Sequence, residues 1–120
     1  MVSRSQGSAW VVHELALMES VVDAVIDQIG EQRVDRVCLE VGQLAGVSIE
    51  ALRFSFDVCT DGTQLAGASL EVTEIAGVAR CRTCGSEEPT RTFASPCTCG
   101  SFDRELVRGS ELRLVAVEVV

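Results

Sequence analysis

Four cysteines toward the C-terminal end of the chain have the spacing of a metal site. The segment CRTCGSEEPTRTFASPCTCG contains a C-x2-C pair, twelve residues and a C-x-C pair, made by Cys81, Cys84, Cys97 and Cys99. A glycine follows each pair, as the turn of a zinc knuckle requires. Four thiolates from two turns can surround one Zn²⁺ at about 2.3 Å. Because such a site has no open coordination position, we expect structural zinc.

Two alternatives to zinc are a pair of disulfides and a C-x2-C redox couple. A redox motif opens a helix after a strand in a thioredoxin-like pattern, and this sequence has no such pattern. The C-x-C pair is tighter than the usual C-x2-C, so we expect one of its thiolates to be strained or exchangeable. Cys38 falls on a predicted strand and Cys59 on an apolar helix face, and both are predicted to be small buried hydrophobic residues.

The only histidine of the chain, His13, stands directly before Glu14 where a helical pattern begins. One interpretation is purely local: Glu14 complements the helix dipole, and His13 is a partly exposed residue ahead of the helix. The HExxH pattern of zinc hydrolases is absent, because position 17 is leucine and no second histidine exists. No Ser/His/Asp group, phosphate loop or dinucleotide fingerprint occurs either, so we predict that the protein is not an enzyme.

Hydrophobic periodicity predicts an α+β fold in which two helices pack on a small three-stranded sheet. The helices are expected from Glu14 to Gly30 and from the N-cap Ser48 to about residue 60. The strands are expected over residues 33–42, 68–75 and 111–120, and the last is apolar on both faces, as a central strand would be. Between the last two strands lies an inserted four-cysteine, zinc-binding, ribbon-like subdomain. The predicted parts are residues 1–11, a disordered extension; 12–76 plus 110–120, the α+β domain; and 77–109, the insert.

Charge and hydropathy limit the classes of partner. The chain has 120 residues and a formal net charge of −8, from 18 acidic and 10 basic residues. This charge opposes binding to nucleic acid and favours cationic partners, metal ions included. No apolar run approaches the roughly 18 residues of a membrane span, and no signal-peptide core is present. We therefore expect a cytoplasmic protein without membrane or nucleic-acid partners.

Several segments together resemble the HypA/HybF family of nickel metallochaperones. They are HELALM, LEVGQLAGV, SIEALRFSFDVCTDGT, SLEVTEI, the four-cysteine insert and GSELRLVAVEVV, and they cover residues 12–120. The resemblance implies that His13 and Glu14 bind nickel, with zinc at the four cysteines. It also implies a GTPase partner of nickel insertion and delivery to the hydrogenase large subunit. A homodimer and service to urease stay open.

In the family, the His-Glu pair follows the initiator methionine, whereas here it follows Val12. A terminal amine, the next backbone amide and the imidazole would form fused chelate rings around planar Ni(II). All ten basic residues are arginine, which indicates a GC-rich gene in which GTG can encode either valine or a start, so we expect Val12 to be the initiator. The rival interpretations are a zinc-ribbon module for protein interaction or nucleic-acid binding, and then a dithiol redox protein.

Overall fold

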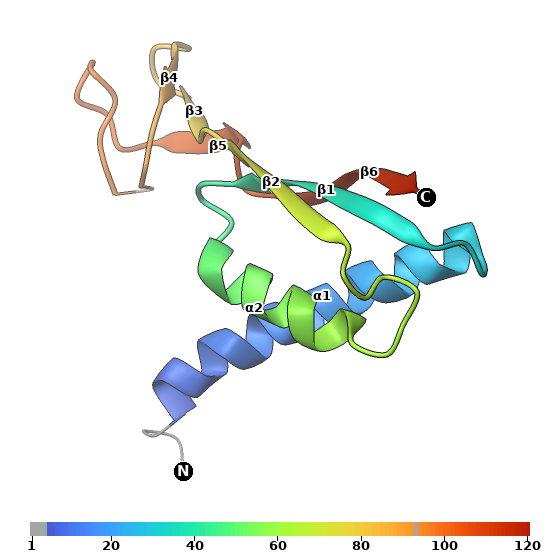
Figure 1. The fold of residues 1–120 in the computed structure, drawn as a ribbon. Coiled ribbons are helices and arrows are strands. Elements are labelled where there is room, and N and C mark those ends of the chain that lie inside the picture. The colour runs from blue at the N-terminus through green and yellow to red at the C-terminus, as the bar shows by residue number, and fades with distance from the viewer. Residues whose placement is uncertain (1–4, 93) are drawn as a thin grey trace. The chain divides into compact units, whose positions relative to one another are not determined.

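The structure is a computed structural model that describes the backbone of residues 5–92 and 94–120, and the side chains from residue 13 onward apart from residue 93 (Figure 1). In chain order the elements are α1 (Ser5–Ile29), β1 (Val34–Gly42), α2 (Ile49–Thr60), β2 (Ser69–Ile75), β3 (Val78–Cys81), β4 (Glu87–Pro89), β5 (Arg104–Arg108) and β6 (Leu112–Val119). The strands form two three-stranded sheets, ordered β2-β1-β6 and β4-β3-β5. The predicted α+β class is confirmed. No helix among the described residues is long and apolar enough to cross a membrane.

One compact unit comprises the described residues up to 39 together with 47–72 and 114–120, and it contains both helices. The apolar stripe predicted for α1 is largely buried, with Met18 and Val25 fully inaccessible to solvent. Leu52 and Phe56 of α2 are also buried, and both helices lie on the same face of the sheet (Figure 1). Helical spacing of these residues is what lets two helices share one core with the sheet.

The start of α2 agrees with the sequence prediction, whereas α1 begins earlier than predicted. Ser48 is the N-cap of α2, as predicted, and its hydroxyl accepts a hydrogen bond from the Ala51 N–H at 3.2 Å. The first helix begins at Ser5, nine residues before Glu14. No proline interrupts this stretch, and each added helical residue contributes a backbone hydrogen bond once a helix has formed. Of the extension predicted to be disordered, residues 1–4 lie outside the described residues and 5–11 are helical.

The prediction that residues 111–120 form a central strand was wrong. The central strand is β1, whose inward side chains Val37, Leu39 and Val41 are buried as expected. β6 lies at the edge of the sheet, where Val115 and Val119 are 48% and 42% exposed. Apolar residues on both faces therefore did not indicate burial on both faces, because the outer face of this sheet is not covered by a second layer of the described chain.

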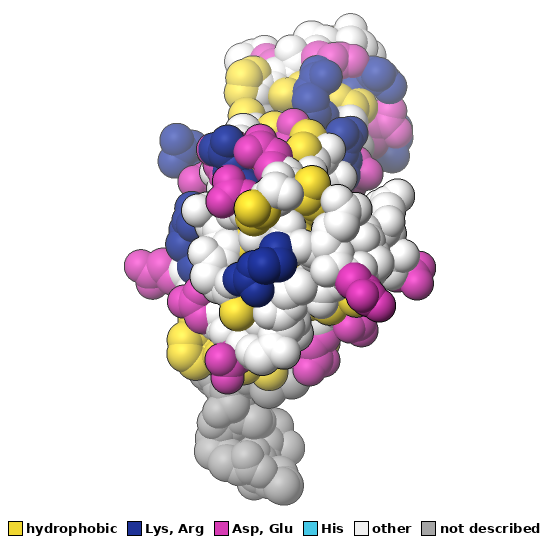
Figure 2. All heavy atoms as spheres, turned by 45° about the vertical axis from the view of Figure 1, so that its right-hand side comes forward, with side chains coloured by type: hydrophobic (Ala, Val, Ile, Leu, Met, Phe, Trp, Pro, Cys, Tyr) yellow, Lys and Arg dark blue, Asp and Glu magenta, His cyan; other side chains and the backbone are white. Residues whose placement is uncertain are grey.

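A second compact unit comprises residues 40–46 and 73–113, which is more than the predicted insert. Within it, β3 pairs antiparallel with both β4 and β5, so Arg80 lies opposite Glu87 on one side and Glu105 on the other. The Arg80 guanidinium contacts these carboxylates at 2.9 and 3.0 Å. Dark blue and magenta side chains lie side by side at the top of Figure 2. Arginine and carboxylate side chains thus compensate one another on this sheet.

Candidate functional site

The four cysteines of the insert converge as predicted. Their sulfur atoms all lie within 4.8 Å of one another. Two Sγ···Sγ distances are 3.7 Å, between Cys81 and Cys99, and 3.6 Å, between Cys84 and Cys97. Four sulfurs at about 2.3 Å from one zinc ion would be roughly 3.8 Å apart, so this cluster fits a tetrahedral ion. All six cysteines are free thiols, which removes the disulfide alternative from this structure.

Two similar turns present the sulfurs, and they differ by one residue. In the first, the Cys81 N–H donates to the carbonyl of Ser86, five residues on, at 2.9 Å. In the second, the Cys97 N–H donates to the carbonyl of Ser101, only four residues on, at 2.8 Å. The glycine of each turn has a positive φ, and no other residue type does so in the described part of the chain. The C-x-C pair thus reaches the cluster by closing its turn one residue earlier.

Hydrogen bonds to sulfur shift the acidity of the thiols in opposite directions. The backbone N–H of Cys99, followed by the Ser86 hydroxyl, lowers the pKa of Cys97 to about 6. The N–H of Cys84 likewise lowers the pKa of Cys81. At Cys99 the N–H of Ser101 acts in the same direction, but burial and the neighbouring thiols outweigh it and raise the pKa to about 12. A divalent ion favours the deprotonated form of every thiol that it binds.

The Ser86 hydroxyl supports two of the four sulfur atoms. Its Oγ lies 3.1 Å from the Cys84 sulfur and 3.5 Å from the Cys97 sulfur. A hydroxyl in this place can donate a hydrogen bond to a thiolate and fix its orientation toward an ion. Sequence reasoning missed this residue, although a serine directly after C-x2-C-G was a visible signal.

The two residues of the predicted nickel site point into different surroundings. His13 is exposed, whereas the Glu14 side chain is fully buried. Its Oε2 accepts a hydrogen bond from the N–H of Ser48 at 2.7 Å, which joins α1 to the N-terminus of α2. Its Oε1 has no hydrogen-bond partner among the described residues. A carboxylate at a helix N-terminus is favourable because that end carries partial positive charge.

The two remaining cysteines are only partly buried, whereas both were predicted to be small buried hydrophobic residues. Cys38 lies on the outer face of β1, with its sulfur 3.6 Å from a carboxylate oxygen of Glu71. Cys59 lies between the helices, with its sulfur 3.9 Å from the Leu15 carbonyl oxygen. Burial, aided by carboxylates nearby, raises the pKa of each thiol. The four-cysteine cluster includes neither of them.

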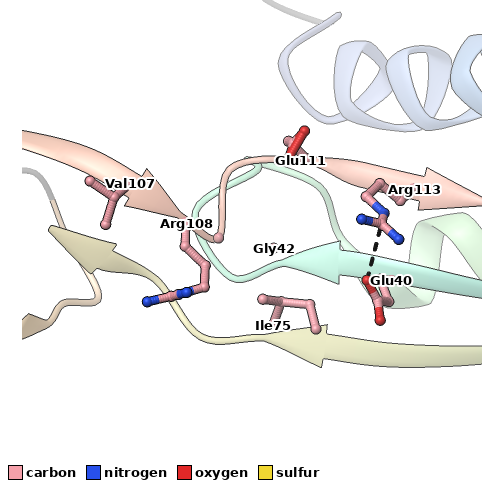
Figure 3. A pocket seen from close by; sticks show the side chains of 8 residues that line it. Glu40, Gly42, Ile75, Val107, Arg108, Glu111 and Arg113 are labelled. Atoms are coloured by element: carbon pink, nitrogen blue, oxygen red, sulfur yellow. Dashed lines mark ion pairs between the residues drawn. The ribbon is translucent and has the colours of Figure 1, made fainter.

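A hollow in the second unit lies where β1, β2, β5 and β6 begin or end (Figure 3). Its lining includes Arg113, whose Nε is 3.7 Å from Glu40, and Arg108, whose nearest carboxylate is Glu87 at 3.9 Å. At its centre a Cβ added to Gly42 would overlap the carbonyl oxygen of Gly109. The backbones at Gly42 and Gly109 can lie this close because Gly42 has no side chain. The hollow therefore lies beside a tightly packed crossing of strands. Its lining contains no cysteine or histidine.

The fold and the cluster define a small α+β protein with a built four-thiol metal site. A family described as hydrogenase/urease nickel incorporation, metallochaperone, matches residues 12–119. Curated relatives include the hydrogenase maturation factor HypA of Nostoc punctiforme, 40% identical over 90% of this chain and 96% of the relative. The factor of the same name from Geotalea daltonii is 42% identical over 91% of this chain and all of the relative.

A solved structure shares the fold. The solution structure of the nickel metallochaperone HypA from Helicobacter pylori has a TM-score of 0.62 at 15% identity, covering 89% of this chain and 97% of that one. The chain belongs to the HypA family of nickel metallochaperones of hydrogenase maturation. The family match begins at residue 12, directly before the His-Glu pair.

Proposed function

We propose that this protein is a non-enzymatic, cytoplasmic nickel carrier that binds Ni(II) at His13 and delivers it for maturation of nickel-iron hydrogenase. A GTPase and the hydrogenase large subunit would be its partners. The observation that carries the proposal is the single, exposed imidazole of His13 at the start of the region that matches the family. An exposed site suits a carrier because the ion must leave as well as bind.

The backbone around His13 bears on how nickel could be held. Ni(II) favours planar nitrogen ligands, and a terminal amine, an amide and an imidazole can supply three of them. In the 120-residue chain, residue 13 lies inside α1, so its amide nitrogen could coordinate only if the first turns unwound. In a chain whose first residue replaces Val12, the same amide would be among the four N–H groups that have no partner within a helix. We therefore expect the shorter chain to bind nickel more tightly.

Glu14 could serve the nickel site in either of two ways. As a ligand, it would have to release the Ser48 N–H and leave its buried position. As an anchor, it would fix the start of α1 to α2 and so orient His13. The variant Glu14→Gln separates these roles, because an amide oxygen still accepts the hydrogen bond but is a much poorer metal ligand. We favour the anchor, since breaking this contact would leave the partly buried Ser48 N–H without its acceptor and displace a fully buried side chain.

The four-cysteine cluster is proposed to hold structural zinc through Cys81, Cys84, Cys97 and Cys99. The distances between the sulfurs support this ion, and thiolate ligands favour it. Zinc would supply stability to a unit that has few large apolar side chains of its own. Its protein ligands would occupy every coordination position, which leaves none for water or substrate.

A Ni(II) titration followed by calorimetry and visible absorption tests the proposal. It compares the 120-residue chain, a chain beginning with methionine in place of Val12, and the His13→Ala variant of each. We expect one planar nickel per short chain, weaker binding by the long chain and no such site in either His13→Ala variant. Binding that survives His13→Ala with an unchanged spectrum would contradict the proposal.

A further inference from the structure

A hollow on the helical side of the first unit is bordered by uncovered apolar side chains. It lies between α1 and α2, and we call it the α1/α2 groove; its lining is Leu15, Glu19, Val22, Asp23, Val58 and Cys59. Val58 is 49% exposed, and Phe54, one helical turn before it, is 59% exposed. Residues four apart lie on the same side of a helix, so the two form one apolar strip beside the groove. An exposed apolar strip beside a groove is typical of an interaction surface.

Carboxylates surround this strip without compensating charge. Glu19, Asp23 and Asp57 are exposed, and none forms an ion pair with another described residue. On the strands of the same unit, by contrast, carboxylates are paired with a cation: Arg36 contacts Glu71 and Glu118 at 3.1 and 2.8 Å. These carboxylates also affect a side chain that lines the groove. Burial is the main cause that raises the pKa of Cys59, and the charges of Glu19 and Asp23 raise it further.

We propose that the α1/α2 groove docks an amphipathic helix of a protein partner that carries lysine or arginine along the border of its apolar face. Leucine-like side chains of that helix would cover Phe54 and Val58, and its cations would meet Glu19 and Asp23. This is recognition of a helix in a groove, with charge selecting the partner. The inference goes beyond nickel carriage and requires no nickel.

The same charges argue against other occupants. A second copy of this chain packed through the same face would place carboxylates opposite carboxylates, which is unfavourable. Anionic lipid surfaces and nucleic acids would be repelled for the same reason. A cationic helix is the occupant that both neutralises the border and buries the apolar strip.

The probe is a synthetic 16-residue peptide of leucine and lysine at helical spacing, with a control peptide in which glutamate replaces every lysine. Binding to the zinc-loaded full chain is measured by calorimetry. Alkylation of each cysteine is followed by peptide mass spectrometry, because Cys59 lines the groove and Cys38 on β1 serves as an internal control. We expect the lysine peptide to slow alkylation of Cys59 about fivefold or more, with Cys38 unchanged and no effect of the glutamate peptide.

Matched variants locate the contact. Phe54→Ser and the pair Glu19→Gln with Asp23→Asn should each weaken binding of the lysine peptide about tenfold, as loss of a central anchor or of the selecting charges would. Val115→Ser on β6, a residue of comparable exposure, should leave binding unchanged. All of these side chains are exposed, and the amide NMR spectrum of each variant checks that it is folded.

Three results would overturn the proposal. They are equal binding of the two peptides, equal weakening by Val115→Ser and Phe54→Ser, and binding that leaves Cys59 unprotected. Protection of Cys59 that rises with protein concentration in the absence of peptide would instead assign the groove to a second copy of the chain.

Discussion

In the second compact unit, residues 40–46 and 73–113, which we call the four-cysteine unit, two turns hold four sulfur atoms within 4.8 Å of one another. Backbone N–H groups and the Ser86 hydroxyl support them. At the start of the region that matches the family, one exposed imidazole stands on a helix, with a buried carboxylate beside it. The first arrangement offers four side-chain ligands to one ion. The second offers a single side-chain ligand and relies on the backbone for the rest. A protein that keeps one ion and transfers another needs this difference.

The largest effect is expected from breaking the cluster. Cys97→Ser removes a buried thiol of the proposed zinc site, and structural zinc contributes on the order of 10 kcal/mol or more in small zinc domains. We expect loss of bound zinc and collapse of the amide NMR dispersion of residues 73–113. Cys38→Ser, outside the cluster, should keep both. Full zinc content and an unchanged spectrum in Cys97→Ser would show that the sulfurs do not hold the unit together.

The second expected effect concerns the strand crossing in the four-cysteine unit. Gly42→Ala would push a methyl group into the Gly109 carbonyl, so we expect it to lower the free energy of unfolding by about 3 kcal/mol. Gly46→Ala is the matched control: its φ is +73°, but nothing lies within 4 Å, and about 1 kcal/mol is expected. Denaturant unfolding measures both. Equal costs would mean that the crossing is not tightly packed.

The third effect tests the role of Glu14 on the nickel side. Glu14→Ala leaves the partly buried Ser48 N–H without its acceptor and a cavity in place of a fully buried side chain, and should cost about 2–3 kcal/mol of stability. Glu14→Gln keeps an acceptor and should cost less than about 1 kcal/mol, and its nickel affinity should stay close to that of the parent chain. Glu19→Ala, an exposed change on the same helix, should be nearly neutral. A nickel affinity reduced tenfold or more by Glu14→Gln alone would make Glu14 a ligand instead.

The smallest effect sharpens the description of the cluster. Ser86→Ala removes the hydroxyl near two sulfurs, so zinc transfer to a chelator should be about tenfold faster. Ser101→Ala is the control, because the Ser101 hydroxyl contacts Thr83 and the Asp103 N–H rather than a sulfur. Competition with a coloured chelator measures the rates. Equal rates of zinc transfer in the two variants would show that the Ser86 hydroxyl does not help to retain the ion.

The sequence correctly predicted several features that depend on residues close together along the chain. The cysteine spacing, the N-cap at Ser48 and the alternation in β1 were all visible, because each depends on residues close in sequence. The edge position of β6 was not, since strand order depends on which segments find each other across the chain. Nor could the sequence show that Glu14 turns inward, because its partner, the Ser48 N–H, lies 34 residues away and belongs to the backbone.

The most direct test of the contrast between the two sites is a chelator challenge of the chain beginning with methionine in place of Val12, loaded with both metals. Elemental analysis follows nickel and zinc during the challenge, with the His13→Ala variant alongside. We predict that nickel leaves within minutes while one zinc per chain stays, and that His13→Ala never takes up the exchangeable nickel. Loss of both metals at the same rate, or nickel retained by the four cysteines in His13→Ala, would contradict the account.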